Sequence, residues 1–378
     1  MKKRGLLVLT VGLIFLAQDA RADKRLTWTS SYSYHPAIAI DSNWYLNVVW
    51  DDFTPTNWEI FFKRSTDMGA TWTANRRITW TSNSSAHPAI AVGWDDILHV
   101  VWEEGLPGNE EIFYKISEDG GATWSAGKRL SSSTGSSLLP SLVANSGGMV
   151  HVVWQDDAPG NSEIYYKKST DHGISWSPSR RLTWNAGNSQ YPVLAMDPAD
   201  NLYLVWTDDT SGSREVYFRQ SWNAGDTWTT TKRLTWLSGL AVAPDIVADS
   251  IGELHIVWED ALPSREAIYY KRTQDWGTRW EVTKRLSWTA GHSQEPSLGI
   301  DSDDNPRVVW SDDSSGNKEI YYRKSTNLGA DWTAAQRITS TSGVSSQPVI
   351  AIDVNGELNL IWSDDTPGNY ELYYQKRS

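Results

Sequence analysis

The stretch Ser65-Thr66-Asp67-Met68-Gly69-Ala70-Thr71-Trp72 returns 52 residues later as Ser117-Glu118-Asp119-Gly120-Gly121-Ala122-Thr123-Trp124. Further copies end on four tryptophans at the same spacing: Trp176, Trp228, Trp280 and Trp332. Other markers keep this period seven times, namely an Arg-Leu/Ile-Thr/Ser pattern from Arg25, a proline from Pro36, and a tryptophan from Trp50 that ends an apolar run. One supersecondary unit has therefore been copied seven times along the chain.

Each unit contains four short runs rich in Val, Ile, Tyr, Phe and Trp, with turn signals between them. In the first unit these runs are residues 36–40, 46–50, 59–64 and 76–80. Such runs fit the pleated, half-buried surface of a β-strand, and no segment has convincing helical periodicity. Seven antiparallel four-stranded units with apolar faces predict an all-β, seven-bladed β-propeller, because each blade can bury both faces on its neighbours.

The two ends of the repeat predict how the ring closes. The seventh copy runs only from Gln336 to Ser378, so it lacks a fourth strand. Residues 24–28, Lys-Arg-Leu-Thr-Trp, form a fourth strand without a blade of their own. We therefore expect the amino-terminal strand to complete the last blade.

The amino terminus has the features of a cleavable signal peptide. Residues 1–22 contain a basic start, an apolar stretch from Leu6 to Ala17, and a small-residue site at Ala20-Arg21-Ala22. The apolar stretch is too short for a membrane span. We expect residues 1–22 to be removed, residues 23–378 to form one propeller domain, and the protein to be secreted or periplasmic without a membrane span.

Charge and composition restrict the classes of partner. Without residues 1–22 the chain has 30 basic and 45 acidic residues, a formal charge of −15. Such a surface repels nucleic acid and anionic membranes, and it favours cations or basic partners. The chain has no cysteine and few histidines, which argues against thiol and zinc chemistry.

The repeated stretch at residues 65–72 resembles the Asp-box, or BNR, repeat (S/T-x-D-x-G-x-x-W) of the sialidase-like β-propellers. Asn replaces Asp in two of the six copies, and both side chains can accept hydrogen bonds from backbone N–H groups in a turn. We therefore interpret the boxes as structural. Their acceptors are Asp67, Asp119, Asp171, Asn223, Asp275 and Asn327, and their tryptophans are Trp72, Trp124, Trp176, Trp228, Trp280 and Trp332.

The face opposite the boxes should carry the candidate binding residues. Acidic pairs follow the second run of each unit, and we select Asp51, Glu103, Asp157, Asp209, Asp313 and Asp365 from them. Tryptophans end the fourth run at Trp28, Trp80, Trp184, Trp236 and Trp288, while Ser132 and Ser340 interrupt the series. Aromatic rings beside carboxylates are typical of sugar sites.

Structural interpretations of the same residues stay open. The second acid after each strand tryptophan, from Asp52 to Asp364, would pair with the repeated arginine or cap the following turn. The tryptophans would then pack between blades. The repeated Glu-Ile-Tyr/Phe-Tyr/Phe motif, as at Glu59, is interpreted as cross-strand packing and surface charge.

No residue is assigned a catalytic role from the sequence. Resemblance to sialidases implies an Arg-Ile-Pro motif, converging arginines and a tyrosine–glutamate pair, but the chain has Arg25-Leu26-Thr27 and no sign of convergence. The turns at residues 301–305 and 353–357 could hold calcium, although a plain hairpin turn explains them and no metal or cofactor is expected. We expect a monomeric module that binds a glycan or an extracellular protein, with a sialidase-like glycoside hydrolase as the alternative.

Overall fold

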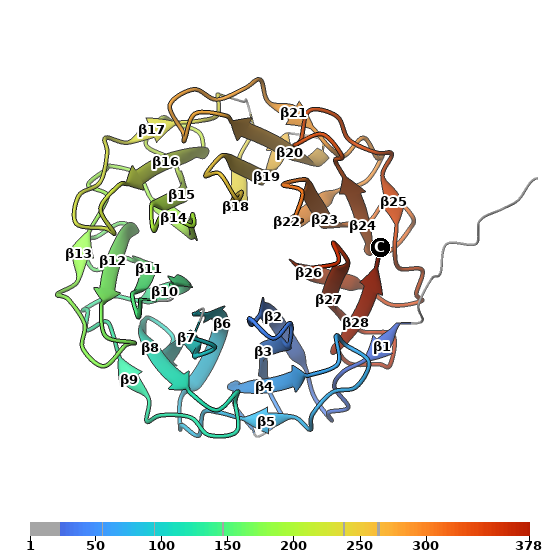
Figure 1. Ribbon diagram of the computed structural model, residues 1–378, viewed down its shortest axis with the longest axis horizontal. Helices are drawn as coiled ribbons and strands as arrows, with labels where there is room; N and C mark the ends of the chain where they lie inside the picture. Colours follow the sequence, from blue (N-terminus) through green and yellow to red (C-terminus); the bar gives the residue numbers. More distant parts are fainter. Residues whose placement is uncertain (1–22, 55, 94, 146, 237–238, 263–264) are drawn as a thin grey trace, which may run out of the picture.

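The computed structural model describes residues 23–378 apart from residues 55, 94, 146, 237–238 and 263–264. The described residues form seven four-stranded antiparallel sheets and no helix. Figure 1 shows these sheets as the blades of a closed ring viewed along its central axis. The prediction of a seven-bladed β-propeller is confirmed. The predicted signal peptide lies outside the described residues.

In each blade the strands run from the centre of the ring outward, and we name these positions A, B, C and D. Position A is formed by β2 (Ser33–Ile40), β6 (Ser84–Val92), β10 (Ser137–Ala144), β14 (Ser189–Met196), β18 (Ala241–Ala248), β22 (Ser293–Ile300) and β26 (Ser345–Ile352). Position B is formed by β3 (Leu46–Asp52), β7 (Leu98–Leu106), β11 (Val150–Asp156), β15 (Leu202–Asp208), β19 (Leu254–Leu262), β23 (Pro306–Asp312) and β27 (Leu358–Asp364).

The outer half of each blade holds positions C and D. Position C is formed by β4 (Glu59–Ser65), β8 (Asn109–Ser117), β12 (Glu163–Ser169), β16 (Glu215–Ser221), β20 (Arg265–Thr273), β24 (Glu319–Lys324) and β28 (Glu371–Arg377). Position D is formed by β5 (Arg76–Arg77), β9 (Lys128–Arg129), β13 (Arg180–Arg181), β17 (Lys232–Arg233), β21 (Lys284–Arg285), β25 (Gln336–Arg337) and β1 (Lys24–Arg25). Blade 1 is the sheet β2 to β5, and blade 7 is the sheet β26, β27, β28 and β1.

The inner and outer strands differ in extent from the sequence-based expectation. The inner strand β2 begins at Ser33 and not at Pro36, because pairing with β3 continues on both sides of a bulge between Tyr34 and Ala37. The outer strand β5 has two residues, whereas the sequence predicted five. It ends there because the hydroxyl of Thr79, and not a backbone carbonyl, accepts the N–H of Ile60 at 2.8 Å.

The amino-terminal strand closes the ring as expected. Strand β1 pairs with β28, with Lys24 opposite Tyr374 and Arg25 opposite Tyr373. Beyond the strand, the backbone N–H of Leu26 donates to Leu372 at 2.7 Å. Hydrogen bonds therefore join the two ends of the described chain in one blade, and Figure 1 shows β1 beside β28.

The hydrophobic core lies between blades and not at the centre of the ring. Seven position-B tryptophans are at most 1% exposed: Trp50, Trp102, Trp154, Trp206, Trp258, Trp310 and Trp362. Trp50 of blade 1, for example, packs with Leu26, Leu372 and Tyr374 of blade 7. Burying one large ring at every blade interface stabilises the ring as a unit.

Loops on the two faces of the ring are sorted by the strand order. The loop after D contacts the loop after B, since Phe53 donates its N–H to the carbonyl of Tyr32 at 3.0 Å. We call this side the rim face. The loop after C contacts the loop after A, since His172 donates its N–H to Gly148 at 2.8 Å. We call this side the box face.

Candidate functional site

The Asp-boxes lie on the box face, in the loops between positions C and D. In blade 1 the Asp67 carboxylate accepts the backbone N–H of Thr71 at 2.7 Å and its hydroxyl at 2.6 Å. These hydrogen bonds, that of the Thr71 side chain foremost, lower the pKa of Asp67 to about 2. Asn223 accepts the equivalent backbone N–H, from Thr227, at 2.8 Å. Every copy of the box therefore keeps a side-chain oxygen that accepts this backbone N–H.

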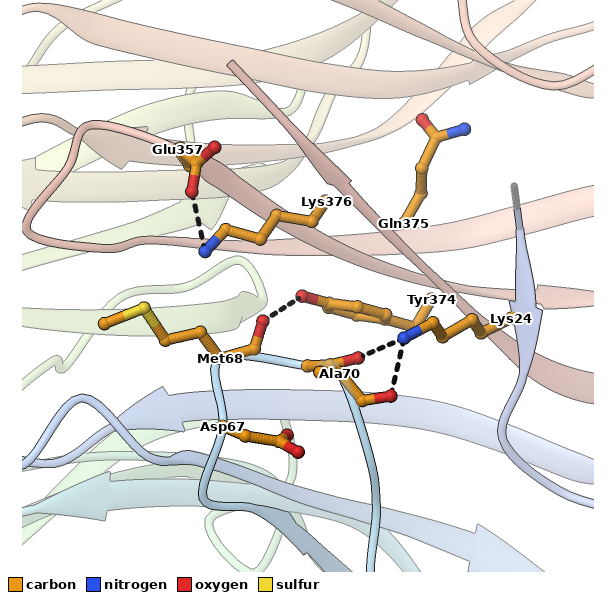
Figure 2. A pocket seen from close by; sticks show the side chains of 9 residues that line it. Lys24, Asp67, Met68, Ala70, Glu357, Tyr374, Gln375 and Lys376 are labelled. Carbon is orange, nitrogen blue, oxygen red and sulfur yellow. Dashed lines mark hydrogen bonds and ion pairs between the residues drawn. The ribbon is translucent and has the colours of Figure 1, made fainter. Parts of the chain in front are cut away.

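Each box also fastens its blade to the preceding one. Figure 2 shows this contact at the ring closure, where Lys24 donates to the carbonyls of Gly69 and Ala70 at 2.7 Å and Tyr374 donates to that of Met68. Gly69 has a φ of +84°, and a Cβ there would lie 2.0 Å from the Tyr374 hydroxyl. Residues of both blades line a cavity of about 480 Å³. These contacts give the boxes a role in joining blades.

The position-D tryptophans lie at the opposite side, on the rim face, and they are exposed. Between 63% and 71% of each residue's surface is accessible, in Trp28, Trp80, Trp184, Trp236 and Trp288. The interpretation that these rings are packed between blades is therefore wrong. In each copy an arginine guanidinium lies over the ring, with its carbon 4.7 to 5.9 Å from the ring centroid.

In six of the seven blades the repeated arginine pairs with the position-C glutamate, and blade 5, which has Ala267 at that position, is the exception. Arg77 contacts Glu59 at 2.6 Å, and the same oxygen accepts the N–H of Thr81 in the following loop. Glu59 is fully buried. The expectation that this glutamate supplies surface charge is wrong, because the charged arginine and the loop N–H together compensate its desolvation.

In five blades the second acid after the strand tryptophan does not pair with the arginine but caps the next turn, whereas Glu104 and Asp260 accept no N–H of that turn among the described residues. The Asp52 carboxylate accepts the hydroxyl of Ser33 at 2.8 Å and the N–H of Thr54 at 2.8 Å. Asp208 repeats both contacts with Ser189 and Thr210. The turn-capping alternative therefore holds for these acids, which are structural in the blades.

The six selected acids fall at two different positions of the repeat, which the sequence-based selection did not separate. Four of them accept the N–H of the facing D–A loop at 2.6 to 2.7 Å, and they are Asp157, Asp209, Asp313 and Asp365. Asp51 and Glu103 instead come directly after the tryptophan, and both contact histidines near the central channel. Within the described part of the chain, none of the six forms a hydrogen bond with a position-D tryptophan.

A funnel of about 460 Å³ opens at the centre of the ring, where each inner strand contributes the repeated proline and its neighbours. The residue before each proline has a positive φ, and its identity changes around the ring: His35, His87, Leu139, Tyr191, Ala243, Glu295 and Gln347. This changing series breaks the sevenfold symmetry. The funnel thus offers one site, whereas the rim offers repeated ones.

Two histidines form one wall of the funnel. The Nδ1 of His35 lies 2.9 Å from Asp51, the Nδ1 of His87 lies 2.7 Å from Glu103, and the two rings have centroids 4.0 Å apart. Burial opposes the charged form of His87, but the Glu103 hydrogen bond and charge leave its pKa raised. Both imidazoles are therefore oriented by carboxylates.

Glu295 makes another part of the funnel lining acidic, and Glu259 lies directly behind it. Burial raises the pKa of Glu259 to about 7, so this carboxyl group is partly protonated at neutral pH. Its Oε2 accepts the N–H of Glu295 in the next blade at 3.2 Å. Glu103 makes the equivalent contact to Leu139 at 2.8 Å. The acid directly after the tryptophan therefore links neighbouring blades around the funnel.

The sequence reasoning missed an aromatic cluster on the rim face at the junction of blades 7 and 1. The ring centroid of Tyr34 lies 4.7 Å from that of Tyr370, 5.8 Å from that of Trp58 and 6.1 Å from that of Tyr32, and the centroid of Phe53 lies 5.3 Å from that of Trp58. Other copies carry mostly polar or small residues at these repeat positions. Departures from the repeat were the signal that could have found it.

The turns considered for calcium are capped hairpins. The Oδ1 of Asp301 accepts the N–H groups of Asp303 and Asn305, and the Oδ1 of Asp353 accepts those of Asn355 and Glu357. Among the described residues, no group of three or more His, Cys, Asp or Glu side chains is placed to hold a metal. The described part of the chain also contains no helix suited to crossing a membrane.

Comparison with known families agrees with the fold and the boxes. Residues 45–256, more than half of the chain, match the model of the BNR repeat-like domain. The chain belongs to this family. The Asp-box resemblance read from the sequence is therefore confirmed for this BNR repeat-like protein. No curated protein sequence matches it.

Solved structures similar to this BNR repeat-like protein are distant in sequence. An ulvan lyase of polysaccharide lyase family PL25, bound to -[GlcA(1-4)Rha3S]-, has a TM-score of 0.68 and 11% identity over 93% of this chain and 96% of its own. A Dyadobacter fermentans protein of unknown function has a TM-score of 0.60 and 12% identity over 94% of this chain and 98% of its own. The NanB sialidase of Streptococcus pneumoniae has a TM-score of 0.53 and 14% identity over 94% of this chain and 69% of its own. At these identities the likeness establishes the fold alone.

Proposed function

We propose that this BNR repeat-like protein is an exported, glycan-binding propeller whose rim face presents five tryptophan platforms. One observation carries the proposal: at a single repeat position, five tryptophans each expose more than 60% of their surface. Indole rings are costly to leave in water, and repeated exposed rings on one face are typical of a binding surface. Ser132 and Ser340 divide the platforms into an arc of two and an arc of three.

The chemistry of the platforms suits the faces of sugar rings. A pyranose presents a C–H face that stacks on an indole ring, while its hydroxyls bond to neighbouring polar groups. Four of the five arginines that lie over a tryptophan are themselves held by a glutamate, as Arg25 is by Glu371 at 2.8 Å. The platform is therefore organised before any ligand arrives, which reduces the entropy lost on binding.

Export of the protein is part of the proposal. It is supported by the signal-peptide pattern of residues 1–22. A monomer is sufficient, because the five platforms supply several weak contacts in one chain.

The proposal is tested by polysaccharide retention with purified protein. We expect wild type to be retained by at least one polysaccharide of a neutral and acidic panel, and a variant with alanine at all five platforms to pass through. The control variant is Trp222→Ala, because Trp222 is 49% exposed but lies beside an Asp-box on the other face. If the fivefold variant were retained like wild type, the rim would not be the glycan site. If no polysaccharide retained this protein but an extracellular protein did, the rim would be a protein-binding surface and the glycan proposal would be wrong.

A second candidate function, glycoside hydrolysis in the funnel, is favoured by one specific observation. Glu259 has a pKa of about 7 and could donate a proton to a leaving sugar, with Glu295 as a second carboxyl group on the next blade. Release of reducing sugar by wild type, abolished in Glu259→Gln but unchanged in the fivefold tryptophan variant, would support it. The same panel of polysaccharides serves both tests.

A further inference from the structure

Blade 5 departs from the other six blades beneath its tryptophan platform. In the six, the repeated arginine pairs with a buried position-C glutamate: Arg25–Glu371, Arg77–Glu59, Arg129–Glu111, Arg181–Glu163, Arg233–Glu215 and Arg337–Glu319. In blade 5 the residue at the glutamate position is Ala267, and Arg285 forms no ion pair with any described carboxylate. One anion has thus been removed from an otherwise retained site.

The donors that hold this carboxylate elsewhere are still present in blade 5. In blade 2 the Glu111 carboxylate accepts from Arg129, from the Ser133 N–H at 2.9 Å and from the Ser131 hydroxyl at 2.5 Å. The corresponding donors in blade 5 are Arg285, the N–H of Thr289 and the hydroxyl of Ser287. A donor set that holds a carboxylate in the same fold is suited to a carboxylate from outside the chain.

A second substitution increases the positive charge at the same place. In blades 1, 3, 6 and 7 an asparagine, such as Asn57, donates to the loop carbonyl, in that case of Thr81 at 3.1 Å. In blade 5 Arg265 takes this position and donates to the carbonyl of Thr289 at 3.0 Å. Relative to these blades, blade 5 has lost the buried negative charge at Ala267 and gained a positive charge at Arg265, while Glu266 adds a negative charge that is paired with His292.

Arg285 also lies closer to its tryptophan than the other arginines do. Its guanidinium carbon is 4.7 Å from the ring centroid of Trp288, whereas the equivalent distances in the paired copies are 5.6 to 5.9 Å. Without the glutamate, the guanidinium rests on a ring that is 71% exposed. Cation and stacking surface are therefore adjacent at the rim.

We infer that Trp288, Arg285 and Arg265 form a subsite for a carboxylate-bearing sugar of the uronic acid type. The inference rests on the proposed glycan-binding function and names the class of sugar at one platform. The sugar ring stacks on Trp288, and its carboxylate takes the role that glutamate has in the other blades. The remaining platforms, whose arginines are paired, bind neutral sugar faces.

Two carboxylates near the subsite, those of Glu266 and Asp312, are already engaged, whereas the buried Asp260 opposite Ala267 has no hydrogen-bond partner among the described residues. Glu266 accepts from His292 at 3.0 Å and from Gln294 at 2.7 Å. Asp312 accepts the hydroxyls of Thr289 and Ser293, both at 2.6 Å. An equivalent aspartate stands beside the glutamate in the other blades, as Asp156 does near Glu111, where the Ser137 hydroxyl approaches both. The fold therefore accommodates a carboxylate next to this aspartate.

The experiment compares a short galacturonate oligomer with its methyl ester, which has the same rings without the charge. Binding is measured by calorimetry in a background where Trp28, Trp80, Trp184 and Trp236 are alanine, so that Trp288 is the remaining platform. We expect the acid to bind roughly tenfold more tightly than the ester. Ala267→Glu, which restores the internal anion, should remove this preference and leave ester binding unchanged. Arg285→Gln should do the same if the glutamate variant does not fold.

The outcomes separate the subsite from the general function. Arg279→Gln is the charge control, since Arg279 is exposed in the Asp-box of the same blade, and it should keep the tenfold preference. Equal binding of acid and ester, or a preference that persists in both Ala267→Glu and Arg285→Gln, would overturn the subsite while leaving the platform function intact. If neither ligand bound and Trp288→Ala changed nothing, both the subsite and the platform at Trp288 would be wrong.

Discussion

Single residues in this protein act through oxygen acceptors that satisfy loop N–H groups. The Asp-box carboxylates, the turn-capping aspartates and five of the six position-C glutamates accept at least one backbone N–H. Unpaired donors in tight loops cost roughly 1 to 3 kcal/mol each when buried. The acceptors therefore explain why acidic residues are so frequent without implying that they react.

The acceptor account predicts how an Asp-box responds to substitution. Asp119→Asn should change the melting temperature little, because Asn223 and Asn327 already serve in two boxes. Asp119→Ala leaves the N–H and hydroxyl of Thr123 without their acceptor. We expect a loss on the order of 1 kcal/mol in the free energy of unfolding, measured in urea. Equal stability of the two variants would contradict the account.

Glu259 predicts a pH dependence of stability. Its carboxyl pKa is raised from 4.5 to about 7 in the folded protein, so the folded state holds the proton more tightly than the unfolded state. The contribution of Glu259 to the free energy of unfolding is therefore fully present below about pH 4.5, and it is lost as the pH rises towards 7. The free energy of unfolding of Glu259→Gln should therefore rise relative to that of wild type as the pH increases across that window, by an amount on the order of 3 kcal/mol. If the difference in free energy of unfolding between wild type and Glu259→Gln did not change with pH, the raised pKa of Glu259 would be contradicted.

At the scale of elements, two-residue outer strands are sufficient because each is reinforced by side chains. Arg77 bonds to Glu59, and Lys24 of β1 bonds to two carbonyls of the next blade's box. The outer strand is thus a connector between blades as well as an edge. This arrangement gives the amino-terminal strand more influence than its length suggests.

Removal of the amino-terminal strand should therefore destabilise the whole ring. Deleting residues 23–29 exposes the edge of β28, unpairs Glu371 and frees the box of blade 1 from Lys24. We expect a melting temperature lowered by several degrees and an increased tendency to aggregate, followed by calorimetry and light scattering. Melting at the parent temperature would mean that closure contributes nothing.

The elements were largely predictable because the hydrophobic pattern and the turns repeat without slippage. The 52-residue spacing indicated blade number, strand count and closure from residues such as Arg25, Pro36 and Trp50. The bulge before Pro36 and the early end of β5 at Arg77 were not predictable, because they depend on hydrogen bonds across strands. The partner of each arginine was missed for the same reason.

At the scale of the whole molecule, function separates into repeated and unique features. Repetition made the platforms of the rim visible in the sequence, although their exposure emerged only from the structure. The funnel and the aromatic cluster around Tyr34 could not be assembled from sequence, since they join residues from distant blades that share no pattern. Blade 5 was visible as a single departure at Ala267, and its meaning required the ion pairs of the other blades.

The central claim is that the five exposed tryptophans act together in binding a glycan. Its most direct test is the apparent affinity for a neutral polysaccharide retained by wild type, measured with Trp28, Trp80, Trp184, Trp236 and Trp288 replaced by alanine one at a time. The account predicts a loss of roughly threefold to tenfold for every replacement, with losses that accumulate in combined variants and none for Trp222→Ala. A single replacement that abolished binding while the other four had no effect would contradict it.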